Sequence, residues 1–164
     1  MSSKVVEGYA SESDHHPLSG YVVLSGTYHA LTAAALYGLH RARRPLPERY
    51  GPFDVVLFGT AVHKLSRLIA KDKVTSFVRA PFTRYEGPGG PGEVEEEPRG
   101  EGLRYAIGEL LVCPYCLGMW VATALALVTA AFPRTGRTLA FVLCTLGISD
   151  ALQIAYSAAE KRML

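Results

Sequence analysis

The chain has 164 residues, of which 49% are apolar and 20% are charged, so its charged fraction lies below the quarter that is typical of soluble domains. Its 17 basic and 15 acidic residues nearly cancel to a net charge of +2, which favours neither nucleic acid nor an acidic substrate as a partner. The 3 cysteines are too few for a disulfide framework. The composition therefore indicates a single domain that lies in a membrane, and we do not expect nucleic acid as a partner.

The chain begins with a polar tail, residues 1–19, which lacks the apolar core and small-residue cleavage site of a cleaved signal peptide. Four apolar stretches follow, each near the ~20 residues that a helix needs to cross hydrocarbon: 20–39, 53–70, 110–132 and 138–156. The second carries Lys64 and Arg67 in its later half, which is also typical of a soluble-core helix with a solvated end. The sequence predicts an all-α, polytopic membrane domain over residues 20–158 with about four transmembrane helices, then a tail over 159–164.

The connection over residues 71–103 is the longest between the apolar stretches. Its middle contains a Gly/Pro-rich run at 87–92 and then four glutamates, so we expect it to be flexible or extended, with no core of its own and with solvated carboxylates. Its beginning, residues 73–84, alternates apolar side chains with cations. This pattern suits either a short segment at the lipid headgroups or an ordinary loop.

The distribution of lysine and arginine predicts the orientation of the chain. With both termini inside, eleven cations would face the cytoplasm and six the outside, counted over the 17 in the sequence. Cytoplasmic loops of membrane proteins carry the excess of basic residues. We therefore expect both termini in the cytoplasm.

The sharpest motif is Cys113-Pro114-Tyr115-Cys116, at the start of the third apolar stretch. Two sulfurs at this spacing can form a disulfide or chelate a soft metal. If the helix is continuous, Glu109 shares one face with both cysteines and Trp120. If Pro114 instead marks the first turn, the helix N-terminus points at Cys113 and stabilises its thiolate.

Three roles for Cys113 and Cys116 remain open from the residues alone: redox chemistry, metal binding, or packing as small apolar side chains. A tetrahedral zinc ion needs four ligands, and Cys144 and His63 are the plausible additions inside the membrane. A metal site would therefore need a second copy of the chain. No catalytic residue or cofactor follows from the sequence.

Asp150 lies near the middle of the fourth stretch, where a carboxylate costs roughly 2.5 to 3.5 kcal/mol on insertion scales. Lys64 lies at a matching depth in the second stretch, and Arg67 is one turn further on. The same layer holds Glu109 and the motif cysteines. We therefore predict a buried polar cluster of Lys64, Arg67, Glu109 and Asp150, serving either as a site for an ion, proton or headgroup or as a structural ion pair.

Three segments, at 63–74, 79–83 and 108–120, resemble the bacterial family catalogued as domain of unknown function 1360, which includes a sporulation protein. The resemblance runs from about residue 53 to residue 156. It implies a small, multi-pass protein of the bacterial cell membrane with an unassigned activity. Membrane thiol oxidoreductases of four helices have a similar architecture, but the loops at 41–52 and 133–137 lack their second cysteine pair.

Three functional hypotheses follow. The first is a non-enzymatic component of an envelope or sporulation process, whose partners are the lipid bilayer and a second copy or another membrane protein. The second is a membrane thiol-disulfide oxidoreductase that uses Cys113 and Cys116. The third is a small transporter or ion-binding protein centred on Asp150.

Overall fold

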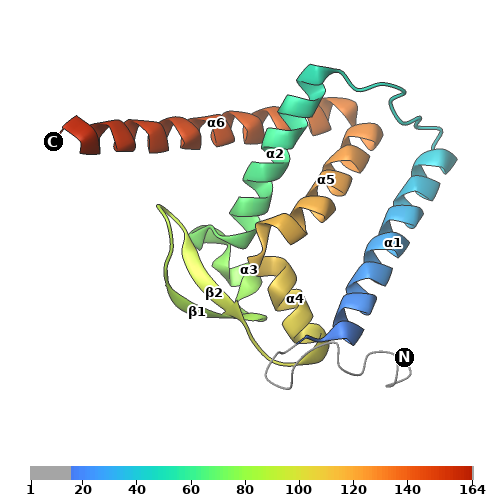
Figure 1. Cartoon of the computed structure of the whole chain (residues 1–164). Helices are drawn as coiled ribbons and strands as arrows, with labels where there is room; N and C mark the ends of the chain where they lie inside the picture. Colours follow the sequence, from blue (N-terminus) through green and yellow to red (C-terminus); the bar gives the residue numbers. More distant parts are fainter. Residues whose placement is uncertain (1–15, 164) are drawn as a thin grey trace.

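The structure is a computed structural model that describes residues 16–163, so most of the predicted tail of residues 1–19 lies outside it. Five helices dominate it (Figure 1): α1 (Leu18–Arg41), α2 (Pro52–Ala70), α4 (Gly102–Val112), α5 (Pro114–Ala131) and α6 (Pro133–Met163). The shorter elements are the 3-10 turn η2 (Lys73–Thr75), α3 (Ser76–Arg79), and the strands β1 (Thr83–Pro88) and β2 (Val94–Pro98). The predicted helical class is confirmed for most of the described chain.

Helix α2 packs against both α5 and α6, and α5 also contacts α1. The core between α2, α5 and α6 consists of Leu57, Ala61, Leu125, Ala140 and Cys144. Ala61 and Ala140 are completely buried, and their small side chains let the helices approach closely. Cys144 therefore serves as a small apolar side chain of the core.

Among the described residues, three helices are long and apolar enough to cross a membrane: α1, α5 and α6. They coincide with the first, third and fourth apolar stretches of the sequence. Helix α2 coincides with the second stretch, but three charged side chains, Asp54, Lys64 and Arg67, lower its apolar character. Its crossing of the membrane stays a prediction.

The third apolar stretch is not one helix. Residue Cys113 adopts an extended conformation, with φ −103° and ψ 103°, between the end of α4 and the start of α5. Pro114, which has no backbone N–H to donate, opens α5 at its first turn. Of the two geometries that the sequence left open, the continuous helix with Glu109 and Trp120 on one face is excluded, because Glu109 lies in α4 and Trp120 in α5 on either side of the break.

The Gly/Pro/Glu-rich connection contains a β-hairpin, which corrects the expectation of an all-α fold. Strands β1 and β2 pair antiparallel from Thr83 opposite Pro98 to Pro88 opposite Val94, with a bulge between Tyr85 and Gly87. The glutamates of β2 and its leading turn, expected to be solvated, form ion pairs with arginine and lysine side chains. Those pairs compensate for the weak strand propensity of glutamate. We call residues 71–98, which include η2, α3 and the hairpin, the cap.

Two glycines bring the cap, α4 and α1 together. A Cβ atom at Gly108 would lie only 2.6 Å from the carbonyl oxygen of Phe82 in the cap, and one at Gly20 would lie 2.7 Å from Cβ of Ala106. Both positions require glycine because the neighbouring backbones are so close. The cap is thereby held against α4, and α4 against the N-terminal half of α1.

Helix α6 runs beyond the helices that it contacts. Its residues 151–162 are all exposed, and in Figure 1 this part extends away from the other helices. The helix continues through residues 159–163, which were expected to belong to a C-terminal tail. The second half of α6 is therefore a helix without a partner among the described residues of this chain.

Candidate functional site: a polar groove and a cysteine pair

Arg79 holds the cap together from the inside. Its side chain is completely buried, and its Nε donates to Oε2 of Glu96 at 2.7 Å. Its Nη1 donates to the carbonyl oxygen of Ile69 at 2.6 Å and to Oγ1 of Thr75 at 2.8 Å, while Nη2 donates to the carbonyl oxygen of Asp72 at 3.1 Å. One guanidinium group thus joins β2, η2 and the end of α2, and a buried charge of this kind is stable only when it is fully paired.

Asp150 of α6 pairs with Lys64 of α2. The Nζ atom of Lys64 lies 2.8 Å from Oδ2 of Asp150 and 3.9 Å from Oδ2 of Asp72. The lysine side chain is 15% exposed and that of Asp150 is 46% exposed. Gly147 permits this contact, because a Cβ atom there would already be 3.1 Å from Cγ2 of Thr60. Lys64 therefore has two acidic neighbours, one on α6 and one in the cap.

The other two residues of the predicted cluster have different partners. Arg67 binds both carboxylate oxygens of Glu93 through Nη2, at 2.5 and 2.6 Å, and Oε1 also accepts from Nε at 3.0 Å. Glu109 accepts a hydrogen bond from the hydroxyl of Tyr21 on α1 at 2.5 Å. The structure therefore brings Lys64 and Asp150 together, pairs Arg67 of α2 with Glu93 of the cap, and places Glu109 at the α1–α4 contact.

A groove of about 940 Å³ opens between α2, the cap and α6. The α2 and cap side is lined by His63, Lys64, Arg67, Asp72 and Glu93. The α6 side carries a polar stripe of Asp150, Gln153, Ser157 and Lys161. Their spacing of three, four and four residues places them on one helix face. Ala151, Ile154 and Ala158 of α6 also line the groove, so it offers apolar surface together with hydrogen-bonding and charged groups on both walls. This mixture fits an amphipathic segment better than an acyl chain.

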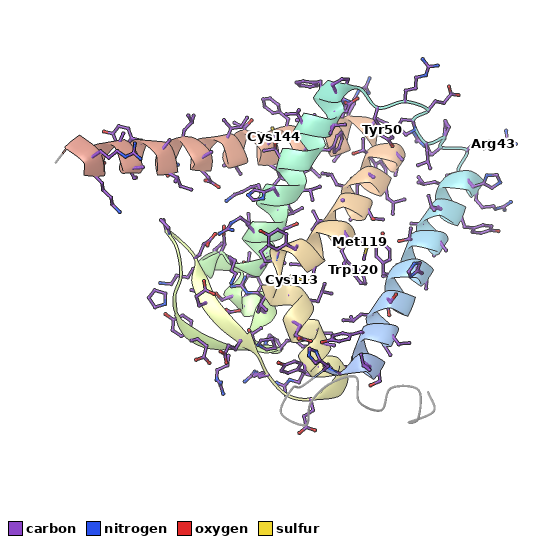
Figure 2. All side chains as sticks on the ribbon, in the orientation of Figure 1. Arg43, Tyr50, Cys113, Met119, Trp120 and Cys144 are labelled. Carbon is purple, nitrogen blue, oxygen red and sulfur yellow. A yellow bond between two sulfur atoms is a disulfide. The ribbon has the colours of Figure 1, made fainter. Side chains whose placement is uncertain are left out.

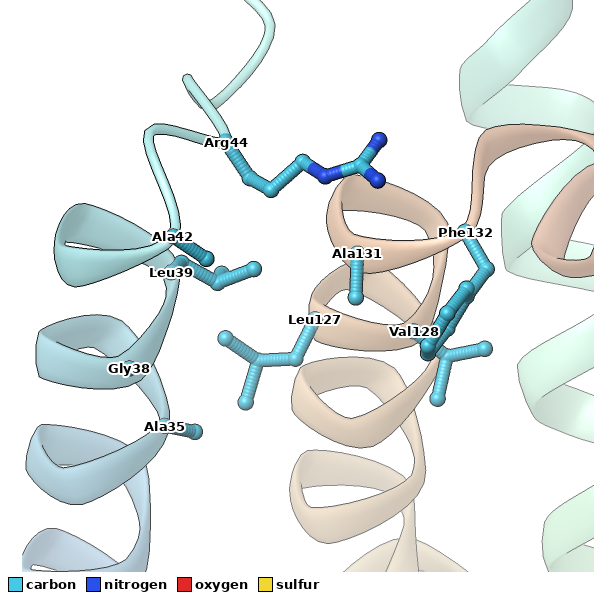
Figure 3. Close-up of a pocket in the computed structure, with 9 residues that line it drawn as sticks. All are labelled: Ala35, Gly38, Leu39, Ala42, Arg44, Leu127, Val128, Ala131 and Phe132. Carbon is cyan, nitrogen blue, oxygen red and sulfur yellow. The ribbon is translucent and has the colours of Figure 1, made fainter.

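A second cavity, of about 480 Å³, lies between the C-terminal ends of α1 and α5 (Figure 3). Its walls are Ala35, Gly38, Leu39, Ala42, Leu127, Val128, Ala131 and Phe132, with Arg44 at one end. Apart from the Arg44 guanidinium, these side chains offer only apolar contacts. The cavity supplies no group for acid-base or nucleophilic chemistry.

Cys113 and Cys116 form a disulfide, with their Cα atoms 5.3 Å apart. Cys113 is the N-cap of α5, and its Sγ accepts a hydrogen bond from the backbone N–H of Cys116 at 3.1 Å. Cys116 is exposed, and the Tyr115 side chain beside it is 93% exposed. Figure 2 shows Cys113 at the junction of α4 and α5, away from the third cysteine, Cys144. Of the two geometries that the motif allowed, the structure has the one in which Pro114 begins the helix.

Metal binding gains no support from the geometry. Within residues 16–163, no three side chains of His, Cys, Asp or Glu are grouped closely enough to hold a metal ion. His63 lines the polar groove and Cys144 lies in the core, so neither joins the cysteine pair as a ligand. The metal hypothesis would still require groups from outside this chain.

Sequence reasoning missed Arg79 and Glu96, the most deeply buried ion pair among the described residues, with 0% and 5% exposed side chains. Arg79 lies among other cations of the connection, so charge counting treated it as one more solvated residue. The sequence pattern gave the opposite signal, because Val74, Phe77 and Val78 would be expected to face inward, whereas the structure exposes them and buries Arg79.

Comparisons with known proteins agree on one family. The model of the family described as "Protein of unknown function (DUF1360)" matches residues 57–156. A protein of Bacillus subtilis named "Sporulation protein YjcA" is 32% identical over 63% of this chain and 90% of that protein. Another from the same organism, named "UPF0713 protein YngL", is 30% identical over 70% of this chain and 86% of that protein. No solved structure gives a significant match.

Proposed function

The chain belongs to the DUF1360 family of proteins of unknown function, and on this premise we propose that it is a membrane component whose polar groove binds a partner and catalyses no reaction. One observation carries the proposal: the polar stripe of α6 lines the groove, yet residues 151–162 are all exposed. No other part of the described chain covers this face of α6. The relative named as a sporulation protein supports a role in sporulation or another envelope process.

The partner is a polypeptide segment at the membrane. Gln153, Ser157 and Lys161 are costly to expose to hydrocarbon, so a helix that carries them in a bilayer must be covered on that face or lie against water. An amphipathic segment in the groove would satisfy them with its hydrogen-bonding side chains and would cover Ala151, Ile154 and Ala158 with its apolar ones. The partner is a second copy of this chain or another membrane protein. With both termini in the cytoplasm, as the cation distribution predicts, the cap and the groove would face the cytoplasm.

The test is site-specific photo-crosslinking in membranes from a bacterium that expresses the chain. A photoreactive amino acid at Gln153 should give a protein adduct, because this position lines the groove. The matched control is Leu152, which is 65% exposed but does not line the groove, and should give little adduct. Adduct masses of twice the chain would identify a second copy. Equal adduct yields from the two positions, or none from Gln153, would contradict the proposal.

A further inference from the structure

We propose that Cys113 and Cys116 are a thiol-disulfide exchange site, in which Cys116 receives the partner's thiolate and Cys113 is the leaving group. The proposal does not depend on the polar groove. It starts from accessibility: Cys116 is exposed, whereas Cys113 is only half-buried between α4 and α5. A thiolate can attack a disulfide only at a sulfur that it can reach from solvent. Here that sulfur belongs to Cys116.

The N-terminus of α5 makes the sulfur of Cys113 the better leaving group. As N-cap of α5, Cys113 lies at the positive end of a helix of 18 residues, and the N–H of Cys116 already points at its Sγ. Both features stabilise a thiolate at Cys113 more than at Cys116, which lies inside the first turn. A better-stabilised thiolate is a better leaving group. The exposure of Cys116 and the stabilised thiolate of Cys113 therefore both favour attack at Cys116 with Cys113 as the leaving group.

The exchange balances without any other reactant than a dithiol. The partner's first thiolate attacks Sγ of Cys116, the Cys113–Cys116 bond breaks, and Cys113 leaves with the electron pair. In the resulting mixed disulfide, the partner's first sulfur is bonded to Sγ of Cys116. The partner's second thiolate then attacks that first sulfur and releases the Cys116 thiolate. The partner loses two electrons and two protons and becomes a disulfide, while the cysteine pair is reduced. A partner disulfide drives the same steps in reverse, with Cys113 resolving the mixed disulfide.

The partner is a dithiol in another polypeptide. Tyr115 lies between the two cysteines and is 93% exposed, so its ring offers a contact surface next to the reacting sulfur. Within the chain, Cys144 cannot take part, because it is buried in the core beside Leu125. Leu125 is nine residues beyond Cys116 on the same helix, or about 13 Å along its axis.

The experiment uses the full chain in lipid nanodiscs, with Cys144→Ala as background to remove the third thiol. The oxidised protein is mixed with reduced glutathione, quenched with acid at intervals, and mapped by peptide mass spectrometry. We expect glutathione on Cys116 in roughly tenfold excess over Cys113. Glutathione predominantly on Cys113, equal labelling of both, or no reaction at millimolar glutathione would overturn the proposal.

Single-cysteine variants give a readout that does not need the disulfide. Cys113 alone, in Cys116→Ala, should react with iodoacetamide at lower pH than Cys116 alone, in Cys113→Ala, because the helix N-terminus favours the Cys113 thiolate. Circular dichroism checks that both variants keep their helices. Identical pH-rate profiles would contradict the leaving-group assignment.

The variant Tyr115→Ala tests whether the thiolate comes from a polypeptide or from a small thiol such as glutathione. With this variant, reduction by a short peptide that contains two cysteines should slow several-fold, whereas reduction by glutathione should keep its rate. If the substitution slows neither reagent, or slows both to the same extent, the polypeptide partner would be removed from the proposal.

Discussion

Replacing Arg79 by methionine should unfold the cap while the helices remain formed. Among the described residues, the variant leaves Glu96, whose side chain is 5% exposed, with the hydroxyl of Thr83 as its remaining donor at 3.0 Å. It also frees the carbonyl oxygen of Ile69, whereas the carbonyl oxygen of Asp72 keeps the N–H and hydroxyl of Thr75 as donors. Breaking a buried ion pair in this way typically costs ~3 to 5 kcal/mol. Hydrogen exchange of the β1 and β2 amides, measured by mass spectrometry, should rise to the rate of unprotected peptide.

The matched control is Arg84→Met in the same hairpin. Arg84 also pairs with two carboxylates, those of Glu86 and Glu97, but its side chain is 68% exposed. Exposed ion pairs add little stability, so the protection of the hairpin amides should barely change. The double variant Arg79→Met with Glu96→Leu should recover part of the protection, since no charge is then left buried. Unchanged exchange in Arg79→Met would show that the pair does not hold the cap.

The second large effect concerns Lys64 and Asp150. Asp150→Ala should lower the amount of protein in membranes, because Lys64 loses its neighbour at 2.8 Å and keeps only Asp72 at 3.9 Å. Lys64→Met combined with Asp150→Leu should restore abundance if the pair is structural, since an apolar pair avoids the desolvation of two charges. A double-mutant cycle on membrane abundance should give a coupling above about 0.5 kcal/mol.

Arg67 supplies the control for that cycle. Its guanidinium is bound by Glu93 and not by Asp150, so Arg67→Met and Asp150→Ala should have additive effects. Additive losses for Lys64 with Asp150 would mean that the 2.8 Å contact contributes nothing. Restored abundance with lost partner crosslinking at Gln153 would instead assign the pair to the groove's function.

The sequence was most informative where a single periodic pattern decides the structure. The apolar stretches predicted the long helices, because hydropathy over ~20 residues is a strong signal that tertiary contacts rarely override. A helix start at Pro114 was one of the two geometries that the motif allowed, and the structure places Pro114 at the first turn of α5. Proline carries this information locally, whatever lies around it.

The cap was harder to predict because its stability comes from contacts between distant residues. Glu93 pairs with Arg67, 26 positions away, and Glu96 pairs with Arg79, 17 positions away. A Gly/Pro/Glu-rich run has little intrinsic preference for strands, so its local composition predicted a loop. Cross-strand charge pairing is visible only once the register of the hairpin is known.

The direct test of membrane integration is extraction of cell membranes with alkaline carbonate, which releases peripheral proteins and leaves integral ones in the pellet. Helices α1, α5 and α6 are long and apolar enough to span, so the full chain should remain with the membranes and be released only by detergent. Recovery of the chain in the carbonate-soluble fraction would contradict an integral membrane protein, and with it the proposed roles of the groove and the cap.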